Sequence, residues 1–221
     1  GFLCINWLTE GRHHGIAHRL VAEAIDYFKI REKTIGVASV GCSVFMYDYF
    51  NVDVLEAPHG RASAAASGVK RARKDRIVFT YQGDGDLAAI GTAETIHACN
   101  RGENIMIVFI NNGIYGMTGG QMAPTTLPGM KSSTSPFGRD VATMGNPIKM
   151  TDIVAQLPGT YFVTRQSVQK PLNARRAKKA IRIAMENQKL NRGLSFVEIV
   201  SSCNSGWRMT PVEANTWMEE N

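Results

Sequence analysis

The sequence predicts an α/β fold: a single doubly wound domain over residues 1–221, with a mostly parallel sheet covered by helices on both faces. Two observations lead to this prediction. Short apolar runs typical of buried parallel strands alternate along the chain with segments of helical periodicity. Polar or glycine-rich turns separate them, as expected where strands and crossover helices alternate. A chain of 221 residues can bury the core that such a domain needs.

In the N-terminal part, the sequence predicts two helices, each followed by a strand. Apolar side chains recur at helical spacing over residues 16–28, and a short strand is expected at 34–40. Residues 60–73 are rich in alanine and other small residues, which favours a tightly packed helix. The continuous apolar run at 77–81 leads into Gly-Asp-Gly, as a buried parallel strand does when it enters a loop.

The middle of the chain continues this alternation. We expect a helix from about 87 to 100, a strand at 105–111, a helix near 151–157 and a strand at 161–163. Residues 113–147 interrupt the order because glycine, proline, serine and threonine are frequent there. A loop of that length in a compact domain is usually functional, so an active-site loop is expected.

The C-terminal part predicts a basic helix, a strand and a capped helix. Lysine and arginine interleave with an apolar stripe over residues 170–192, and the apolar run at 194–200 is expected to be a strand. The last helix, 210–219, opens with Thr-Pro-Val-Glu. This motif supplies an N-cap, a proline at the first helical position and a glutamate for a capping box.

Composition and charge argue against several classes of protein. The net charge is +6, but its excess lies on residues 170–192, where no aromatic side chains are interleaved to stack on bases. A solvated face is the first interpretation of this helix and a surface for a partner protein or an acidic carrier is the second, with nucleic acid disfavoured. The longest apolar stretch, 105–110, is far shorter than the ~20 residues of a membrane span.

The cellular compartment is predicted from the N-terminal residues and from the cysteines. Residues 1–15, expected to be an N-terminal extension, contain no export signal. The chain has four scattered cysteines and no CxxC, which fits no disulfide framework. We therefore expect a cytoplasmic protein.

Polar residues directly follow three predicted strands, at 41–43, 83–85 and 111–112. The carboxyl ends of parallel strands meet at one edge of the sheet, where such folds bind ligands. The two glycines of Gly-Asp-Gly permit a sharp turn, and the helix that follows favours an anion such as phosphate. An acid beside a phosphate requires a cation between them. The carboxylate of Asp84 and the amide oxygen of Asn112 are therefore expected to bind one Mg²⁺.

Gly-Asp-Gly followed about 30 residues later by Asn-Asn resembles the thiamine-diphosphate-binding motif. In that motif the aspartate, the second asparagine and the backbone carbonyl two residues further on bind the Mg²⁺ of the diphosphate. The corresponding positions are Asp84, Asn112 and Ile114, the last through its carbonyl oxygen.

The resemblance extends over nearly the whole chain to the β subunits of 2-oxoacid:ferredoxin oxidoreductases. It is carried by residues 40–43, 59–61, 81–97, 109–121 and 199–207. It implies the diphosphate-module fold and a set of cofactor-binding residues. These are Gly41, Cys42, Ser43, His59, Gly83, Gly85, Asp86, Asn112, Thr118, Gly119 and Gly120. A core role is the alternative for His59, and a small buried hydrophobe is the alternative for Cys42.

The resemblance leaves one cofactor open. Many family members bind an iron–sulfur cluster through four cysteines, and Cys42 and Cys203 occupy two of these positions. Thr9 and Arg12 stand where the remaining CxxC pair is expected, and two thiolates alone cannot hold a four-ligand cluster. Cys4 could substitute only after rearrangement.

The resemblance implies a subunit of an enzyme that oxidatively decarboxylates 2-oxoglutarate or a branched-chain 2-oxoacid. The products would be an acyl-coenzyme A and electrons passed to ferredoxin, with thiamine diphosphate and Mg²⁺ as cofactors. In thiamine enzymes a glutamate on a pyrimidine-binding domain activates the cofactor, and 221 residues leave no room for that domain. No catalytic residue is therefore expected in this chain. An alpha (pyrimidine-binding) subunit would supply the glutamate, and gamma and delta subunits are further candidate partners.

Two other functions stay open. A split non-oxidative thiamine-dependent decarboxylase or synthase would release an aldehyde instead of reducing ferredoxin. A non-catalytic scaffold subunit would bind no cofactor. A nicotinamide dehydrogenase is disfavoured because no GxGxxG follows the first strand.

Overall fold

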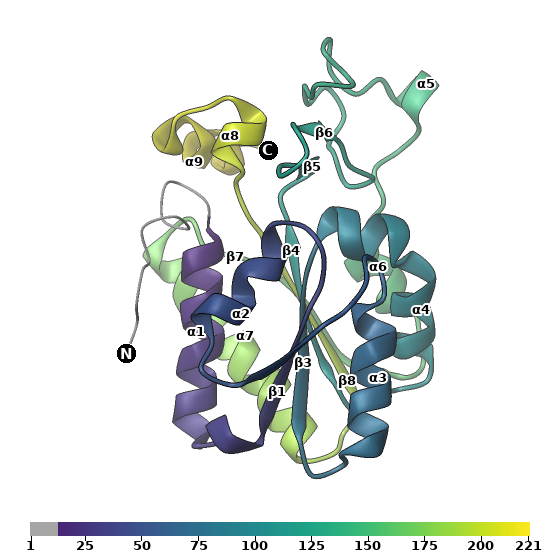
Figure 1. The fold of residues 1–221 in the computed structure, drawn as a ribbon. Coiled ribbons are helices and arrows are strands. Elements are labelled where there is room, and N and C mark those ends of the chain that lie inside the picture. Colours follow the sequence, from purple (N-terminus) through teal and green to yellow (C-terminus); the bar gives the residue numbers. More distant parts are fainter. Residues whose placement is uncertain (1–12) are drawn as a thin grey trace.

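A computed structural model describes residues 13–221, which form a six-stranded sheet with helices on both faces (Figure 1). The strand order is β2-β1-β3-β4-β8-β7, and every neighbouring pair is parallel. The predicted doubly wound α/β fold is confirmed. The strands are β1 (Thr34–Ala38), β2 (Asp53–Glu56), β3 (Ile77–Gly83), β4 (Met106–Asn111), β7 (Thr160–Ser167) and β8 (Leu194–Val200).

The central strands are buried on both faces because alternate side chains enter two different cores. On β4, Met106, Val108 and Ile110 pack in one core, whereas Ile107 and Phe109 pack in the other. This arrangement explains the continuous apolar runs of the sequence. Helices α1 (His14–Phe28) and α7 (Pro171–Lys189) cover the first face, and α3 (Ala62–Ala72), α4 (Thr92–Asn100) and α6 (Met150–Val154) cover the second (Figure 1).

Several predicted boundaries shift by a few residues, and two of these shifts are at helices α1 and α7. Helix α1 begins at His14, inside the segment expected to be an N-terminal extension; the rest of that segment, residues 1–12, lies outside the described part of the chain. The basic helix α7 is shorter than predicted. None of the helices within 13–221 combines the length and apolarity that crossing a membrane would require.

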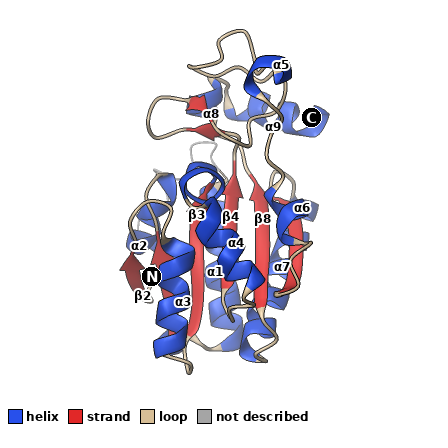
Figure 2. Ribbon diagram, turned by 90° about the vertical axis from the view of Figure 1, so that its right-hand side faces the viewer, coloured by secondary structure: helices blue, strands red, loops and turns tan. Residues whose placement is uncertain are grey.

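The C-terminal cap is confirmed. The Thr210 side chain accepts a hydrogen bond from the Glu213 N–H, and the Glu213 carboxylate accepts one from the Thr210 N–H at 2.7 Å. These bonds start α9 (Pro211–Glu220), which packs against α8 (Asn204–Trp207) through the rings of Trp207 and Trp217. Both helices lie beyond the carboxyl ends of the strands (Figure 2).

Residues 113–147 were expected to be a loop, and the structure shows that they contain short regular elements. Strands β5 (Ile114–Tyr115) and β6 (Gln121–Met122) form an antiparallel pair, and α5 (Val141–Met144) follows. The buried guanidinium of Arg139 joins residues 123–126 to residues 144–146 of the segment, because backbone carbonyls saturate its N–H groups. The acceptors are the carbonyl oxygens of Ala123, Pro124, Thr126, Met144, Gly145 and Asn146.

The sequence did not predict β2 and the short helix α2 (Met46–Tyr49). Strand β2 lies at the edge of the sheet and is mostly exposed, with acidic residues at both ends, so it has no apolar run. The loop after it returns across the carboxyl edge of the sheet.

The helix expected from about residue 87 begins instead with a π-helical turn, Asp86–Ile90, which precedes α4. The loop after β2 approaches this turn closely. A Cβ on Gly60 (φ +77°) would lie 2.5 Å from a methyl carbon of Ile90 and 2.8 Å from the backbone nitrogen of Gly91. Only glycine permits this contact, which brings His59 against Asp86.

Candidate functional site

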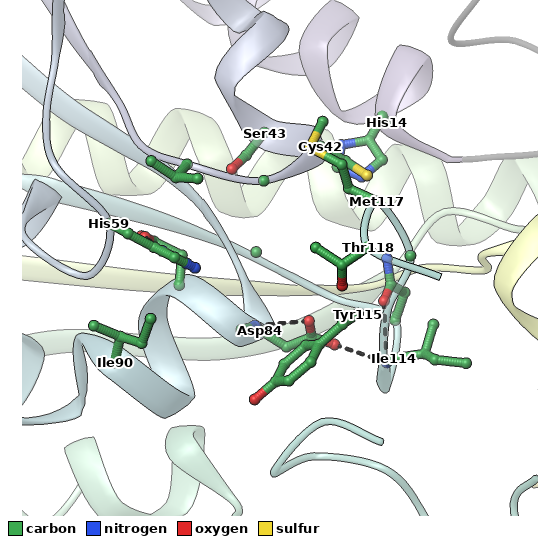
Figure 3. A pocket seen from close by; sticks show the side chains of 17 residues that line it. His14, Cys42, Ser43, His59, Asp84, Ile90, Ile114, Tyr115, Met117 and Thr118 are labelled. Carbon is green, nitrogen blue, oxygen red and sulfur yellow. Dashed lines mark hydrogen bonds and ion pairs between the residues drawn. The ribbon is translucent and has the colours of Figure 1, made fainter. Parts of the chain in front are cut away.

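A cavity of about 170 Å³ lies at the carboxyl ends of β1, β3 and β4 (Figure 3). The chain leaves β1 toward β2 on one side and returns to β3 on the other, so the direction of the crossovers reverses here. Such a reversal leaves a crevice between the turns, and ligands of open α/β sheets bind there.

The cavity brings together most of the residues predicted from the sequence. Its lining includes Gly41, Cys42, Ser43, His59, Gly83, Asp84, Gly85, Asp86, Asn112, Ile114 and Thr118. Gly119 and Gly120 do not line it. They follow directly in the β5–β6 turn, both with positive φ, and Gly116 and Met117 line the cavity instead.

Asp84 and Asn112 converge on one backbone group. The Ile114 N–H donates to Oδ2 of Asp84 and to Oδ1 of Asn112, each at 3.2 Å. The two predicted metal ligands therefore reach the same point from the ends of β3 and β4, although 28 positions separate them in the sequence. A carboxylate and an amide oxygen this close form a donor set that suits Mg²⁺.

The Asp84 carboxylate is only 4% exposed. Burial raises its pKa to about 6, although hydrogen bonds from the backbone of Gly85 and Ile114 and from the Thr125 hydroxyl oppose the rise. An ionised carboxylate buried without a cation costs free energy. A divalent ion at this position would remove that cost.

The hydroxyl group of Thr125 is a contact that the sequence did not reveal. It donates to Oδ2 of Asp84 at 3.3 Å, and the neighbouring Thr126 hydroxyl donates to the Gly113 carbonyl at 2.5 Å. Both threonines belong to the 113–147 segment. That segment therefore contacts Asp84, a predicted metal ligand, directly.

His59 and Asp86 form a hydrogen-bonded pair at the cavity wall. Nδ1 of His59 lies 2.6 Å from Oδ1 of Asp86, and the His59 side chain is 37% exposed. The buried Asp86 carboxylate also accepts hydrogen bonds from the Ser39 hydroxyl, the Gly60 N–H and the Gln82 amide, each at 2.6 Å. We expected Asp86 to face the diphosphate, but its carboxylate is occupied by these four donors. His59 is not a core residue, since its ring lines the cavity.

Two further features of the lining can accommodate a cofactor. The Ser43 hydroxyl is buried and has no hydrogen-bond partner among the described residues, so a ligand atom could bond to it. A Cβ on Gly85 would lie 2.7 Å from the Tyr115 ring, so glycine keeps the start of the π-helical turn close to β5. Together with the Asp84–Asn112 donor set, these features fit thiamine diphosphate held through Mg²⁺.

Cys42 and Cys203 approach each other across Gly116. A Cβ on Gly116 would lie 2.7 Å from the Cys203 sulfur and 4.0 Å from that of Cys42. Two of the positions predicted for an iron–sulfur cluster therefore converge. Thr9, Arg12 and Cys4 lie outside the described residues, and within 13–221 no group of three metal-binding side chains forms. The cluster stays a prediction.

His14 is a lining residue that we did not predict. Its Nδ1 lies 3.1 Å from the hydroxyl of Tyr81, a fully buried residue of β3. Burial raises the Tyr81 pKa well above its ordinary value, so the hydroxyl keeps its proton. His14 belongs to the 9–15 stretch that we compared with the family's cysteine motif, but we did not predict a role in the site for it.

Known proteins resemble this chain in sequence and in fold. Residues 39–199 match the family described as thiamine pyrophosphate enzyme, C-terminal TPP binding domain. The chain is 45% identical over 210 residues to the ketoisovalerate oxidoreductase subunit VorA of Methanothermobacter thermautotrophicus, a match that covers 95% of this chain and 44% of that protein. It is 40% identical over 196 residues to the 2-oxoglutarate synthase subunit KorB of Methanocaldococcus jannaschii, covering 88% of this chain and 68% of KorB.

A solved structure agrees with these matches. The 2-oxoglutarate:ferredoxin oxidoreductase from Magnetococcus marinus, with 2-oxoglutarate, coenzyme A and succinyl-CoA bound, superposes with a TM-score of 0.77 and 28% identity. The match covers 92% of this chain and 64% of that one. The chain spans less than half the length of the VorA relatives. The chain belongs to the thiamine pyrophosphate enzymes and, within them, to the β subunits of the 2-oxoacid:ferredoxin oxidoreductase family.

Proposed function

We propose that this chain is the thiamine-diphosphate-binding subunit of an enzyme that oxidatively decarboxylates a 2-oxoacid to an acyl-coenzyme A and passes the electrons to ferredoxin. The observation that carries the proposal is the convergence of Asp84 and Asn112 on the Ile114 N–H. The names of the relatives support the reaction class, since VorA is a ketoisovalerate oxidoreductase subunit and KorB a 2-oxoglutarate synthase subunit.

In this proposal Asp84, Asn112 and the Ile114 carbonyl hold Mg²⁺, and the turns after β1 and β3 hold the cofactor. Bound thiamine diphosphate supplies a thiazolium ring that accepts the electrons of decarboxylation. The chain's own task is to bind and orient. The Ser43 hydroxyl offers a hydrogen bond, and Asp84 offers a negative charge matched to the metal.

His59 has a defined orientation in this site. Because the Asp86 carboxylate only accepts hydrogen bonds, the His59 nitrogen that faces it, Nδ1, must carry a proton. The other ring nitrogen, Nε2, has no hydrogen bond among the described residues. We propose that Nε2 contacts the cofactor or the substrate.

The activating glutamate is proposed to come from another polypeptide. Among the described residues, the acids that line the cavity are Asp84 and Asp86, and both have the partners given above. No glutamate lines it within 13–221. The purified chain alone is therefore expected to bind thiamine diphosphate weakly and to decarboxylate nothing. Turnover by the chain alone would contradict this assignment.

A branched-chain 2-oxoacid is the substrate class that we favour over 2-oxoglutarate. The described lining includes the apolar side chains of Val40, Ile90 and Met117, and no lysine or arginine that could pair with a second carboxylate. The comparison of kcat/KM for 3-methyl-2-oxobutanoate and 2-oxoglutarate tests this preference. A higher value for 2-oxoglutarate would reverse it.

The reaction class is tested with the enzyme assembled from this chain and the subunits that copurify with it. We expect reduction of ferredoxin that requires a 2-oxoacid, coenzyme A, thiamine diphosphate and Mg²⁺ together. Release of an aldehyde without reduction of ferredoxin would favour a non-oxidative decarboxylase or synthase. Failure of the assembled enzyme to bind thiamine diphosphate would favour a scaffold subunit.

A further inference from the structure

Glu198 is a buried acid that the cofactor motif does not include. It lies on β8 and is only 1% exposed. Its Oε2 accepts hydrogen bonds from Nε of Arg165, at 2.9 Å, and from the Thr151 hydroxyl. These two groups neutralise and anchor one side of the carboxylate. The other oxygen, Oε1, is directed at the neighbouring strand β4.

Oε1 of Glu198 reaches the turn that contains the metal ligand. It accepts a hydrogen bond from the Asn111 amide nitrogen at 2.7 Å, and the Asn111 amide oxygen accepts one from the Gly113 N–H at 3.2 Å. The Asn111 side chain therefore links the Glu198 carboxylate to the backbone of Gly113, the residue that follows Asn112.

Two further bonds hold the same turn. Nε1 of Trp207 donates to the Asn112 carbonyl at 3.0 Å, and the Thr126 hydroxyl donates to the Gly113 carbonyl. The backbone carbonyls of Asn112 and of the next residue, Gly113, are thus both engaged. The Asn112 amide oxygen contacts the Ile114 N–H and is otherwise available for a metal ion.

A carboxylate at position 198 can accept hydrogen bonds on both of its oxygens, which a neutral amide side chain cannot do. Its neighbours Arg165, Thr151 and Asn111 all donate, and a carboxylate can accept from all of them. A glutamine would have to turn its NH₂ group toward either Asn111 or Arg165, so one of the links would break. A buried ion pair is also not needed for packing, since apolar residues often fill such a volume at lower cost.

We propose that Glu198 is a positioning residue that, through Asn111, fixes the Asn111–Gly113 turn so that Asn112 presents its amide oxygen to Mg²⁺. The inference rests on the proposed metal site, and it adds a residue from the far side of β4 to it. Outer partners of metal ligands typically change metal affinity by about 10–100-fold when they are replaced.

The test measures Mn²⁺ binding in place of Mg²⁺. The enzyme assembled from this chain and its copurifying subunits is saturated with thiamine diphosphate, and free Mn²⁺ is counted by its electron paramagnetic resonance signal. Glu198→Gln is expected to weaken Mn²⁺ binding by about 10–100-fold. Asn111→Ala breaks the same link without touching the ion pair. It is expected to weaken binding to a similar extent, and the double variant should be no weaker than the single ones.

Glu103 provides a matched control. It is also a buried glutamate paired with arginines, Arg71 at 2.6 Å and Arg101 at 2.8 Å, but it lies at the amino end of β4, away from the cavity. Glu103→Gln should lower thermal stability in the same way and leave Mn²⁺ affinity unchanged. Thermal stability alone therefore cannot distinguish the two sites, whereas metal affinity can.

The outcomes distinguish failure of the positioning role of Glu198 from failure of the proposed function. Unchanged Mn²⁺ affinity in Glu198→Gln and Asn111→Ala would overturn the positioning role, and so would an equal loss in Glu103→Gln. If Glu198→Gln does not fold, Asn111→Ala decides alone. If the wild-type enzyme binds no Mn²⁺ in the presence of thiamine diphosphate, the proposed function fails instead.

Discussion

Nδ1 of His59 lies 2.6 Å from Oδ1 of Asp86, in a site where three further donors also reach that carboxylate. The pair depends on the close approach of Gly60 to the π-helical turn, because this contact brings the loop after β2 onto the start of that turn. The arrangement fixes the orientation and the tautomer of the imidazole before any ligand arrives.

Asp86→Asn is expected to disturb this pair and to destabilise the protein by about 1–3 kcal/mol. An asparagine can accept on one side only, so at least one buried donor loses its partner. The proton on Nδ1 of His59 is no longer fixed, which nitrogen chemical shifts of the imidazole can detect. Ser39→Ala removes one donor and leaves the carboxylate, so it should keep the Nδ1 proton. An unchanged His59 spectrum in Asp86→Asn would contradict the orienting role.

Asp84→Ala is expected to abolish Mg²⁺-dependent binding of thiamine diphosphate and to leave the fold intact. The carboxylate is the only charged ligand that the motif supplies, and its loss removes the attraction for the ion. Calorimetry with and without Mg²⁺ measures the effect. Unchanged affinity would reject Asp84 as a ligand.

Asp84→Asn separates binding from stability. A rise in the Asp84 pKa from 3.8 to about 6 corresponds to roughly 3 kcal/mol of destabilisation when the carboxylate is ionised. Because lost hydrogen bonds offset part of the gain, the metal-free variant should be at least as stable as the wild type at pH 7.5. A marked loss of stability in Asp84→Asn would show that the folded chain stabilises the negative charge of Asp84 without a metal ion.

The sequence predicted those parts of the fold that have a local signal. Strand β8 covers the predicted residues 194–200 because both of its faces are buried and its apolar run is continuous. Strand β2 was missed because an exposed edge strand needs no such run. The π-helical turn was predicted as ordinary helix, and nothing local in the sequence indicates its close contact with Gly60, a residue distant in the sequence.

Only part of the candidate site could be predicted from the sequence, namely the residues that directly follow predicted strands. Asp84 and Asn112 follow strands that end at the same edge, so the topology alone brings them together. Thr125, Trp207 and Glu198 support the same turn from other segments, and nothing local in the sequence relates them to it.

The free energy of unfolding is expected to decrease as the pH is lowered below 6.5, because of His18. Its ring packs against Tyr49, Phe50 and Tyr81, and neither ring nitrogen has a hydrogen-bond partner among the described residues. Burial lowers the pKa of His18 to about 3, and the neighbouring charge of His14 acts in the same direction.

The sign follows from where the proton binds. Above pH 6.5, His18 is neutral in both states and has no effect on stability. Between pH 6.5 and about 3 the unfolded chain binds a proton that the folded chain does not. Stability therefore falls as the pH decreases, by up to about 1.4 kcal/mol per pH unit. Below about pH 3 the contribution is constant.

His18→Phe should remove this part of the pH dependence. Urea unfolding at pH 7.5, 6.5 and 5.5 (conditions set about the ordinary histidine pKa) measures the slope in both proteins. His13, whose pKa burial also lowers, keeps its contribution in both, so the difference between the curves isolates His18. Parallel curves would refute the prediction.

Arg139→Met is expected to release the 113–147 segment and to weaken the cofactor site with it. The guanidinium has backbone carbonyls as its partners, and methionine leaves them without donors. The loss of even two such bonds, at about 1 kcal/mol each, favours local opening by about tenfold or more. Limited proteolysis should therefore cut within the segment at least about tenfold faster.

Arg139→Lys should rescue the segment only in part, because an ammonium group has three donors and cannot reach all the carbonyls at 123–126 and 144–146. Arg176→Met, an exposed change on α7, serves as the control and should alter neither proteolysis nor binding. Thr125 contacts Asp84, so the release of the segment should also lower the affinity for thiamine diphosphate and Mg²⁺. Faster proteolysis with unchanged affinity would mean that Asp84 holds its position without Thr125.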